Sequence, residues 1–175
     1  QSLLPFVIIE LANTHGGCKD NVRLLIDEVR SLKYPNKGIK FQIFHPDRIA
    51  LPDFPWHPVY QDLFFDKTTW FEFIETAASF CDVWVDVFDT YSTEILEKFV
   101  ETVKGVKIQA SVLGNKEVLQ RLKSLDLSNT EALINISGYS LDEINSFLEI
   151  FSKIFSKVIL QVGFQDFPTK VADTG

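Results

Sequence analysis

The chain has 175 residues, of which 46% are hydrophobic and 23% charged, which is typical of one globular domain with its own core. Its formal net charge of −7 argues against a nucleic-acid or anionic-membrane surface, which needs a basic footprint, and no apolar run approaches the roughly 20 residues that span a bilayer. The two cysteines, Cys18 and Cys81, form no CxxC pair, so we expect reduced thiols in a cytoplasmic protein.

Six strands with five helices between them are predicted along the chain. In chain order, the strands are predicted at residues 5–11, 38–44, 82–88, 105–111, 132–137 and 157–163. The helices between them show apolar residues at helical spacing, beginning at Val22, Trp70, Ile95, Val118 and Leu141. The third of these patterns extends to Val103. Asn115 is a predicted N-cap, and Ser140 and Glu143 have the spacing of a capping box at the start of the last helix.

The connection after the second strand is unusually long. It runs from His45 to about Asp66 and is rich in proline and aromatic residues. Such a segment could form a lid, an interface or simple packing beneath the rim of a barrel. We expect His45 and His57 within it to be surface groups.

Repeated strand–helix units predict a parallel sheet, either closing into a barrel or forming an open doubly wound sheet. Successive residues of a strand point to opposite sides, so each strand can be sorted into two sets. One set is wholly apolar, as in Ile39, Phe41 and Ile43. The other set brings a polar group from every strand: Glu10, Lys40, Gln42, Asp86, Lys107, Gln109, Ser111, Asn135, Ser137 and Gln161.

An open doubly wound sheet has apolar residues on both faces of its central strands. A single polar face instead indicates an α/β fold of the TIM (β/α)8-barrel type, here with about six strand–helix units of parallel sheet. The polar set would then line the interior, near the carboxyl ends of the strands where barrel enzymes have their sites. The alternative is a buried ionic lattice in which Lys40 and Lys107 only neutralise Glu10 and Asp86.

Several short motifs, in matching order, resemble the N-acetylneuraminate (sialic acid) synthase family. IIELANTHGG is similar to the family's AEIGxNHxG and aligns Glu10, Asn13 and His15. IKFQ is similar to VKFQ and aligns Lys40, and VKIQASVLGN is similar to FKIASGDLTN and aligns Lys107. VFDTYSTEIL resembles PFDxxSVDxL, SLDEI resembles TLEEI, and FPT resembles the family's YPTP.

The resemblance implies an enzyme that condenses phosphoenolpyruvate with an N-acylated amino sugar to give a nonulosonic acid. In the family a metal polarises the aldehyde of the open-chain sugar, carbon 3 of the enol attacks it, and water at carbon 2 leads to phosphate loss. The resemblance implies that Lys40 and Lys107 hold the two anionic groups of phosphoenolpyruvate. Glu10 would orient the sugar or the water, which makes these three residues the catalytic candidates.

The remaining candidates are assigned to substrate binding: Asn13, His15, Gln42, Asp86, Gln109, Ser111, Asn135, Ser137 and Gln161. Gln42 would hydrogen-bond the sugar, and Asn135 and Ser137 could donate to the phosphate. A lone loop histidine such as His15 is more often a structural residue than a base.

The sequence departs from the family at three places. Asp86 stands where the family has a threonine that contacts phosphoenolpyruvate, and a carboxylate repels phosphate unless a cation intervenes. Ala110, Ser111 and Val112 replace a Ser-Gly-Asp/Glu triplet. Gln161 replaces a metal-binding histidine, so the divalent metal that the resemblance implies, Mn²⁺ or Mg²⁺, has no assigned ligand here.

The resemblance covers the first six of eight barrel units. We therefore expect residues 1–175 to be a single synthase-like barrel domain, incomplete at its C-terminus, that forms homo-oligomers through its open edges. Three other functions remain open. They are a Schiff-base aldolase or lyase using Lys107, a catalytically reduced sugar- or anion-binding relative, and a structural or regulatory fragment.

Overall fold

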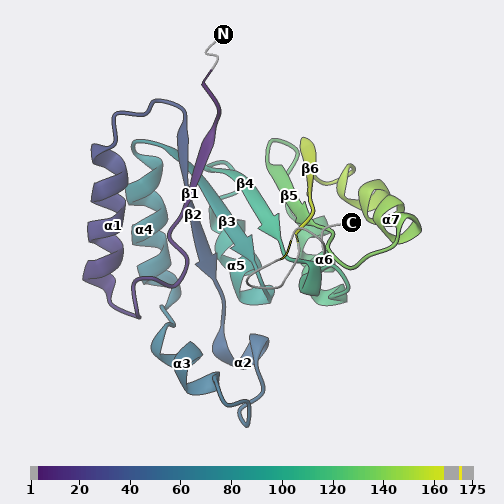
Figure 1. Ribbon diagram of the computed structural model, residues 1–175, viewed down its shortest axis with the longest axis horizontal. Coiled ribbons are helices and arrows are strands. Elements are labelled where there is room, and N and C mark those ends of the chain that lie inside the picture. Colours follow the sequence, from purple (N-terminus) through teal and green to yellow (C-terminus); the bar gives the residue numbers. More distant parts are fainter. Residues whose placement is uncertain (1–3, 164–169, 171–175) are drawn as a thin grey trace.

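The computed structural model describes residues 4–163 and Lys170; the FPT motif at 167–169 lies outside these residues. One parallel sheet runs in sequential order through β1 (Val7–Glu10), β2 (Lys37–Ile43), β3 (Asp82–Val87), β4 (Val103–Ile108), β5 (Glu131–Asn135) and β6 (Lys157–Gln161). Figure 1 shows this sheet curling, with helices along its outer side. Because the strand order never reverses, the sheet belongs to a barrel and not to a doubly wound fold. The predicted partial TIM-type barrel is confirmed.

The helices of the described residues are α1 (Lys19–Ser31), α2 (Pro46–Ile49), α3 (His57–Asp62), α4 (Lys67–Ala78), α5 (Thr90–Lys98), the 3₁₀ turn η1 (Ala110–Val112), α6 (Lys116–Ser124) and α7 (Leu141–Phe151). The predicted caps are confirmed: Asn115 caps α6, and Ser140 with Glu143 forms a capping box on α7. These side chains satisfy backbone N–H groups that a helix start leaves unpaired. None of these helices is long and apolar enough to cross a membrane.

Strand alternation separates the core from the candidate site. The predicted apolar set packs against the helices, and Ile39, Phe41 and Ile43 on β2 are each at most 1% exposed. Phe41 meets Trp70 of α4 with ring centroids 6.0 Å apart. Burying side chains of this size contributes about 1.5–3 kcal/mol each. The other set, which includes the buried Lys40, faces the concave side.

Several predicted boundaries are wrong, because a residue pattern does not show where backbone pairing stops. Helix α5 ends at Lys98, and Val103 begins β4, where it pairs with Val83. Strand β4 ends at Ile108, so Gln109 and Ser111 belong to the turn that follows. For these two residues, strand parity no longer sets the direction of the side chain. Ser137 likewise lies beyond the end of β5.

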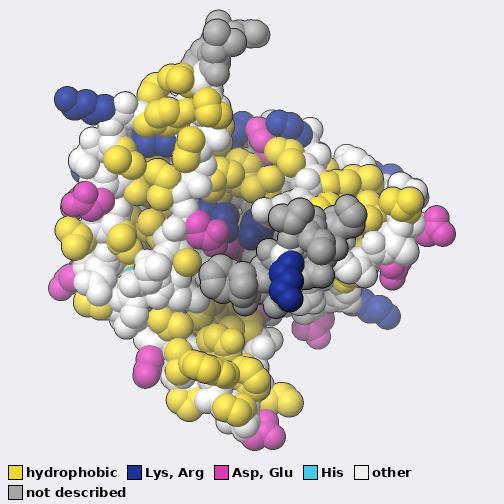
Figure 2. All heavy atoms as spheres, viewed as in Figure 1, with side chains coloured by type: hydrophobic (Ala, Val, Ile, Leu, Met, Phe, Trp, Pro, Cys, Tyr) yellow, Lys and Arg dark blue, Asp and Glu magenta, His cyan; other side chains and the backbone are white. Residues whose placement is uncertain are grey.

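The long connection after β2 is folded into α2 and α3, which project together from the carboxyl end of the sheet (Figure 1). The prediction that His57 is a surface group is wrong: it is 5% exposed, and its Nε2 lies 2.8 Å from Asp47 Oδ1. His45 is half-buried because its ring packs against those of Phe64 and Tyr91. Figure 2 shows hydrophobic atoms gathered over this projection. Its exposed apolar side chains are Leu51, Phe54, Trp56 and Val59.

Candidate functional site

A row of charged side chains lies on the concave face of the sheet, near the carboxyl ends of β1–β4. Lys40 Nζ lies 2.8 Å from Glu10 Oε1 and donates a short hydrogen bond to Asp86 Oδ2. Gln42 Nε2 donates to Glu10 Oε1 over 2.6 Å. Strand register explains the convergence, because Glu10 is the β-partner of Lys40, and Asp86 is the partner of both Gln42 and Lys107. We call Glu10, Lys40, Asp86 and Lys107 the ion cluster.

The ion cluster has two acidic and two basic members, and two of the four, Lys40 and Asp86, are deeply buried. The Lys40 side chain is 5% exposed and that of Asp86 is fully buried. Burial raises the pKa of Asp86, although the charges of Lys40 and Lys107 oppose the rise. Burial also pushes the pKa of Glu10 upward, but the hydrogen bond and charge of Lys40, the charge of Lys107 and the hydrogen bond of Gln42 together hold it below its ordinary value. Glu10 is therefore ionised at neutral pH.

Two oxygen atoms near this cluster are buried without a hydrogen-bond partner among the described residues: Asp86 Oδ1 and Asn13 Oδ1. A buried oxygen without a donor costs about 1–3 kcal/mol. By contrast with Lys40, Lys107 forms no ion pair within the described part of the chain, and it is half-buried. The site thus contains unsatisfied acceptors and one ammonium group that is not engaged by a carboxylate.

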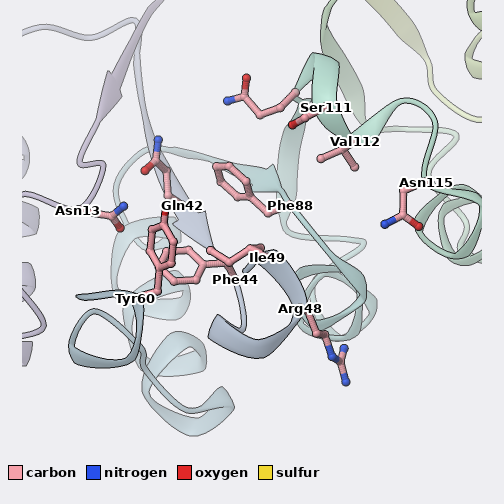
Figure 3. A pocket seen from close by; sticks show the side chains of 11 residues that line it. Asn13, Gln42, Phe44, Arg48, Ile49, Tyr60, Phe88, Ser111, Val112 and Asn115 are labelled. Carbon is pink, nitrogen blue, oxygen red and sulfur yellow. The ribbon is translucent and has the colours of Figure 1, made fainter. Parts of the chain in front are cut away.

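A cavity of 560 Å³ lies beside the ion cluster (Figure 3), and Gln42 connects the two because it lines the cavity and donates to Glu10 of the cluster. Its amide and hydroxyl lining comes from Asn13, Gln42, Gln109, Ser111 and Asn115. Its apolar lining comes from Phe44, Ile49, Tyr60, Phe88 and Val112. Arg48 completes the lining and is held by Thr90 and Glu94. A pocket with one apolar side and several convergent polar groups is typical of a small-molecule site.

The predicted site residues fall into separate groups. Four of them line the cavity: Asn13, Gln42, Gln109 and Ser111. The catalytic candidates lie beside the cavity in the ion cluster. Asn135, Ser137 and Gln161 do not line it; instead Asn135 Oδ1 accepts from the Ser137 backbone N–H at 2.9 Å, and Ser137 Oγ accepts from the Gly163 N–H at 2.9 Å. The first bond is local to the end of β5, and the second ties the residues that follow β5 to those that follow β6.

Sequence reasoning did not find the apolar lining, because only the polar residues on the interior side of each predicted strand were taken as candidates, although Phe44 and Phe88 lie on that side of the predicted strands 38–44 and 82–88. Tyr60 lies on α3, inside what looked like an irregular loop, and Phe44 and Phe88 each follow the last residue of a strand. Asn115 was recognised only as a helix cap. For Tyr60, the aromatic density of residues 45–66 was the available signal.

His15 lies outside the cavity lining and packs as a structural residue does. It is 2% exposed, its Nδ1 accepts from the Gly17 N–H at 3.0 Å, and its ring centroid lies 4.9 Å from that of Phe65. Burial lowers the pKa of this imidazole. Since Nδ1 accepts a hydrogen bond, the neutral ring carries its proton on Nε2.

Acid should therefore weaken the fold through His15. A histidine whose pKa is lower in the folded state has no effect well above about pH 6.5, its unfolded value, and costs stability as the pH falls from there toward the folded pKa. We expect the variant His15→Asn, which keeps an acceptor for Gly17, to lose less stability than the wild type between about pH 7.5 and pH 5. Urea unfolding at both pH values measures the difference. Identical losses in the two proteins would contradict this assignment.

The metal that the family resemblance implied is not matched by the residues described. Among residues 4–163 and Lys170, no three His, Cys, Asp or Glu side chains are grouped so as to hold a metal ion. Gln161, which replaces a metal-binding histidine of the family, is exposed at the end of β6. The reaction considered below is therefore derived from protein side chains alone.

Parallel strands in sequential order, helices on the outer side and polar groups at the carboxyl strand ends define the class: a partial α/β barrel with its candidate site where barrels of this kind bind ligands. No protein-family model matches the chain, and no curated protein matches its sequence.

Solved structures supply the particular likeness. The chain is similar to an N-acetylneuraminic acid (sialic acid) synthetase from Leptospira borgpetersenii serovar Hardjo-bovis, with 21% identity, a TM-score of 0.79 and coverage of 96% of this chain and 57% of that one. It is also similar to a protein from Chromobacterium violaceum described as spore coat polysaccharide biosynthesis protein E, with 16% identity, a TM-score of 0.78 and coverage of 97% of this chain and 52% of that one. A third similar structure is the spore coat polysaccharide biosynthesis protein SpsE from Bacillus subtilis, with 18% identity, a TM-score of 0.69 and coverage of 97% of this chain and 47% of that one.

These matches confirm, at the level of the fold, the likeness that the sequence motifs implied. The chain spans about half the length of the solved structures that it matches, from 47% to 57%.

Proposed function

We propose that this protein is a sugar-acid synthase of carbohydrate biosynthesis, which condenses phosphoenolpyruvate with an N-acylated amino sugar. The observation that carries the proposal is the ion cluster beside an amide-lined cavity, in a fold shared with a sialic acid synthetase. The pairing of a cationic group with neutral amides suits a small anion and a polyhydroxylated partner bound together.

In the proposed reaction, Lys107 provides the free cation for phosphoenolpyruvate, and Lys40 adds its charge from within the cluster. The amides of Gln42 and Asn13 hydrogen-bond the sugar hydroxyls, and the Asn13 Oδ1 acceptor gains the donor that it now lacks. Carbon 3 of the enol attacks the aldehyde carbon: the enol double bond opens, which leaves carbon 2 electron-deficient, and the aldehyde oxygen takes a proton from water and becomes a hydroxyl. A second water then adds at carbon 2, with ionised Glu10 accepting its proton. The new carbon 2 hydroxyl becomes the keto group as the bond from carbon 2 to the phosphate oxygen breaks and inorganic phosphate leaves.

The test is a turnover assay with the purified protein, phosphoenolpyruvate and a panel of N-acylated hexosamines, following phosphate release and the sugar-acid product by mass spectrometry. We expect Lys107→Met to lower kcat/KM by about 100-fold or more, because a preorganised charge is lost. Lys104→Met is the matched control: it lies on the same strand and pairs with Glu131 away from the cavity. Phosphate release that is absent with every sugar in the wild type would refute the proposal.

A second function, sugar binding without catalysis, is favoured by one observation. Asp86 forms an ion pair with Lys40 and so neutralises its charge, at a position where the synthase family has a threonine. A protein built this way would bind the sugar without turning it over. Sugar binding by calorimetry, without phosphate release, would support this catalytically reduced relative.

The charge of Asp86 can be tested directly. We expect Asp86→Thr to bind phosphoenolpyruvate at least about 10-fold more tightly than the wild type, since two like charges some 4 Å apart repel by up to about 4 kcal/mol at an effective dielectric constant of 20. Asp86→Asn, which keeps the shape and removes the charge, should show a gain in the same direction. Calorimetric titration measures all three proteins. Equal affinities would show that the carboxylate does not limit anion binding.

A further inference from the structure

One side of the cavity is an apolar wall that the reaction above does not use. Phe44 is at its centre, with its ring centroid 5.8 Å from that of Tyr60 and 6.3 Å from that of Phe88, both in edge-to-face contact. Ile49 lies beside these rings. Figure 3 shows Phe44, Ile49 and Tyr60 close together, with Ser111 and Asn115 across the cavity from them. We call Phe44, Ile49, Tyr60 and Phe88 the apolar wall.

The two proposed substrates offer few groups that suit such a wall. Phosphoenolpyruvate is small and carries two anionic groups, and an open-chain sugar carries hydroxyl groups along its length. Placing either against aromatic rings would leave polar groups without hydrogen-bond partners, which is unfavourable. Of the groups on these two substrates, the methyl or alkyl end of the N-acyl group is the one whose transfer from water to an apolar surface is favourable.

We propose that the apolar wall is the binding subsite for the N-acyl group, and that Ile49 limits the length of the acyl chain. The proposal rests on the function proposed above and names the part of the substrate that this surface selects. The acyl amide would lie between the wall and the polar lining, where the Gln109 and Ser111 side chains can satisfy it. The alkyl end would contact the edges of Phe44 and Phe88.

Ile49 is expected to limit the length of the acyl chain because it lines both this cavity and a second one. A second cavity of 410 Å³ is lined by Ile49 and by neighbours in the α2–α3 projection, including Leu51 and Phe54. Phe54 stacks on Tyr60 with ring planes 11° apart. Ile49 and the Tyr60–Phe54 stack therefore stand between the two cavities. A smaller side chain at position 49 would give a long acyl chain access to the second cavity.

The experiment compares calorimetric affinities of the purified protein for one hexosamine carrying no acyl, acetyl, propanoyl, butanoyl or pentanoyl group. In the wild type, each methylene that fits the wall should tighten binding about 4-fold, from about 0.8 kcal/mol per buried methylene, until the chain reaches Ile49. Ile49→Ala should raise the ratio of pentanoyl to acetyl affinity by about 10-fold or more, and the larger Ile49→Phe should lower it. Val59→Ala, an exposed change on α3 that lines neither cavity, should leave the ratio unchanged.

The outcomes separate the two proposals. If the wild type releases phosphate but neither change at Ile49 moves the acyl preference, the acyl subsite is wrong and the synthase function stands. If no sugar releases phosphate but the preference shifts in opposite directions in Ile49→Ala and Ile49→Phe, the subsite stands and the synthase function fails. If affinity is the same with and without an acyl group, or no sugar binds, the subsite is wrong.

Discussion

Replacing Lys40 with methionine is expected to lower the free energy of unfolding by about 3–5 kcal/mol, the cost typical of breaking a buried ion pair from one side. The substitution keeps most of the volume of the side chain but leaves Asp86 buried and without its cation. The loss of Lys40 destabilises the Glu10 carboxylate less, because the Glu10 side chain is 38% exposed and keeps its hydrogen bond from Gln42. Urea unfolding followed by far-ultraviolet circular dichroism gives the change.

The double variant Lys40→Met/Asp86→Leu tests the reason for that loss. Removing both charges and filling the space with apolar groups should recover most of the stability, because replacing a whole buried pair is often close to neutral. Lys153→Met is the surface control. Lys153 pairs with Glu149 on exposed side chains, and its loss should be below about 1 kcal/mol. A double variant as unstable as the single one would contradict the coupling of Lys40 to Asp86.

Replacing Gly17 with alanine is expected to cost about 2–5 kcal/mol, as the sum of backbone strain and overpacking. Gly17 has φ +75°, and a Cβ there would lie 1.9 Å from the backbone oxygen of Asp62. A backbone atom cannot rotate aside as a flexible side chain can, so either the loop after β1 or the end of α3 has to move. Because α3 carries Tyr60, this change should also weaken acyl selectivity.

Gly16 offers a matched control one residue away. It too has a positive φ, +57°, but a Cβ there would meet nothing within 4 Å. Gly16→Ala therefore carries only the backbone strain, about 1–2 kcal/mol. Thermal or urea unfolding of both variants measures the difference. Equal losses would show that the approach of Gly17 to Asp62 does not constrain the protein.

Much of the architecture could be predicted from the sequence. All six strands exist, and the alternation within β2 correctly separates Ile39 and Phe41, which face the helices, from Lys40, which faces the concave side. The helix caps at Asn115 and Ser140 were also visible, because a cap depends only on its own residues and the next turn. The fold likeness implied by the ordered motifs is matched by solved structures.

Other features could not be predicted because they depend on which segments meet. The alternation placed Glu10, Lys40 and Asp86 on one face, but only the register of β1, β2 and β3 decides that Lys40 holds both carboxylates. The end of β4 at Ile108 is set by where its neighbours stop pairing with it. Gln109 and Ser111 therefore line a cavity from a turn and not from a strand.

By itself, then, the sequence determined the parallel strand–helix repeat and the face on which its charges lie, since both follow from periodicities carried by neighbouring residues. Only the tertiary structure decided the partners of Lys40, the burial of His57 and the apolar wall that includes Tyr60. These depend on contacts between residues far apart in the chain, and the local pattern of a segment does not specify the surface against which it packs.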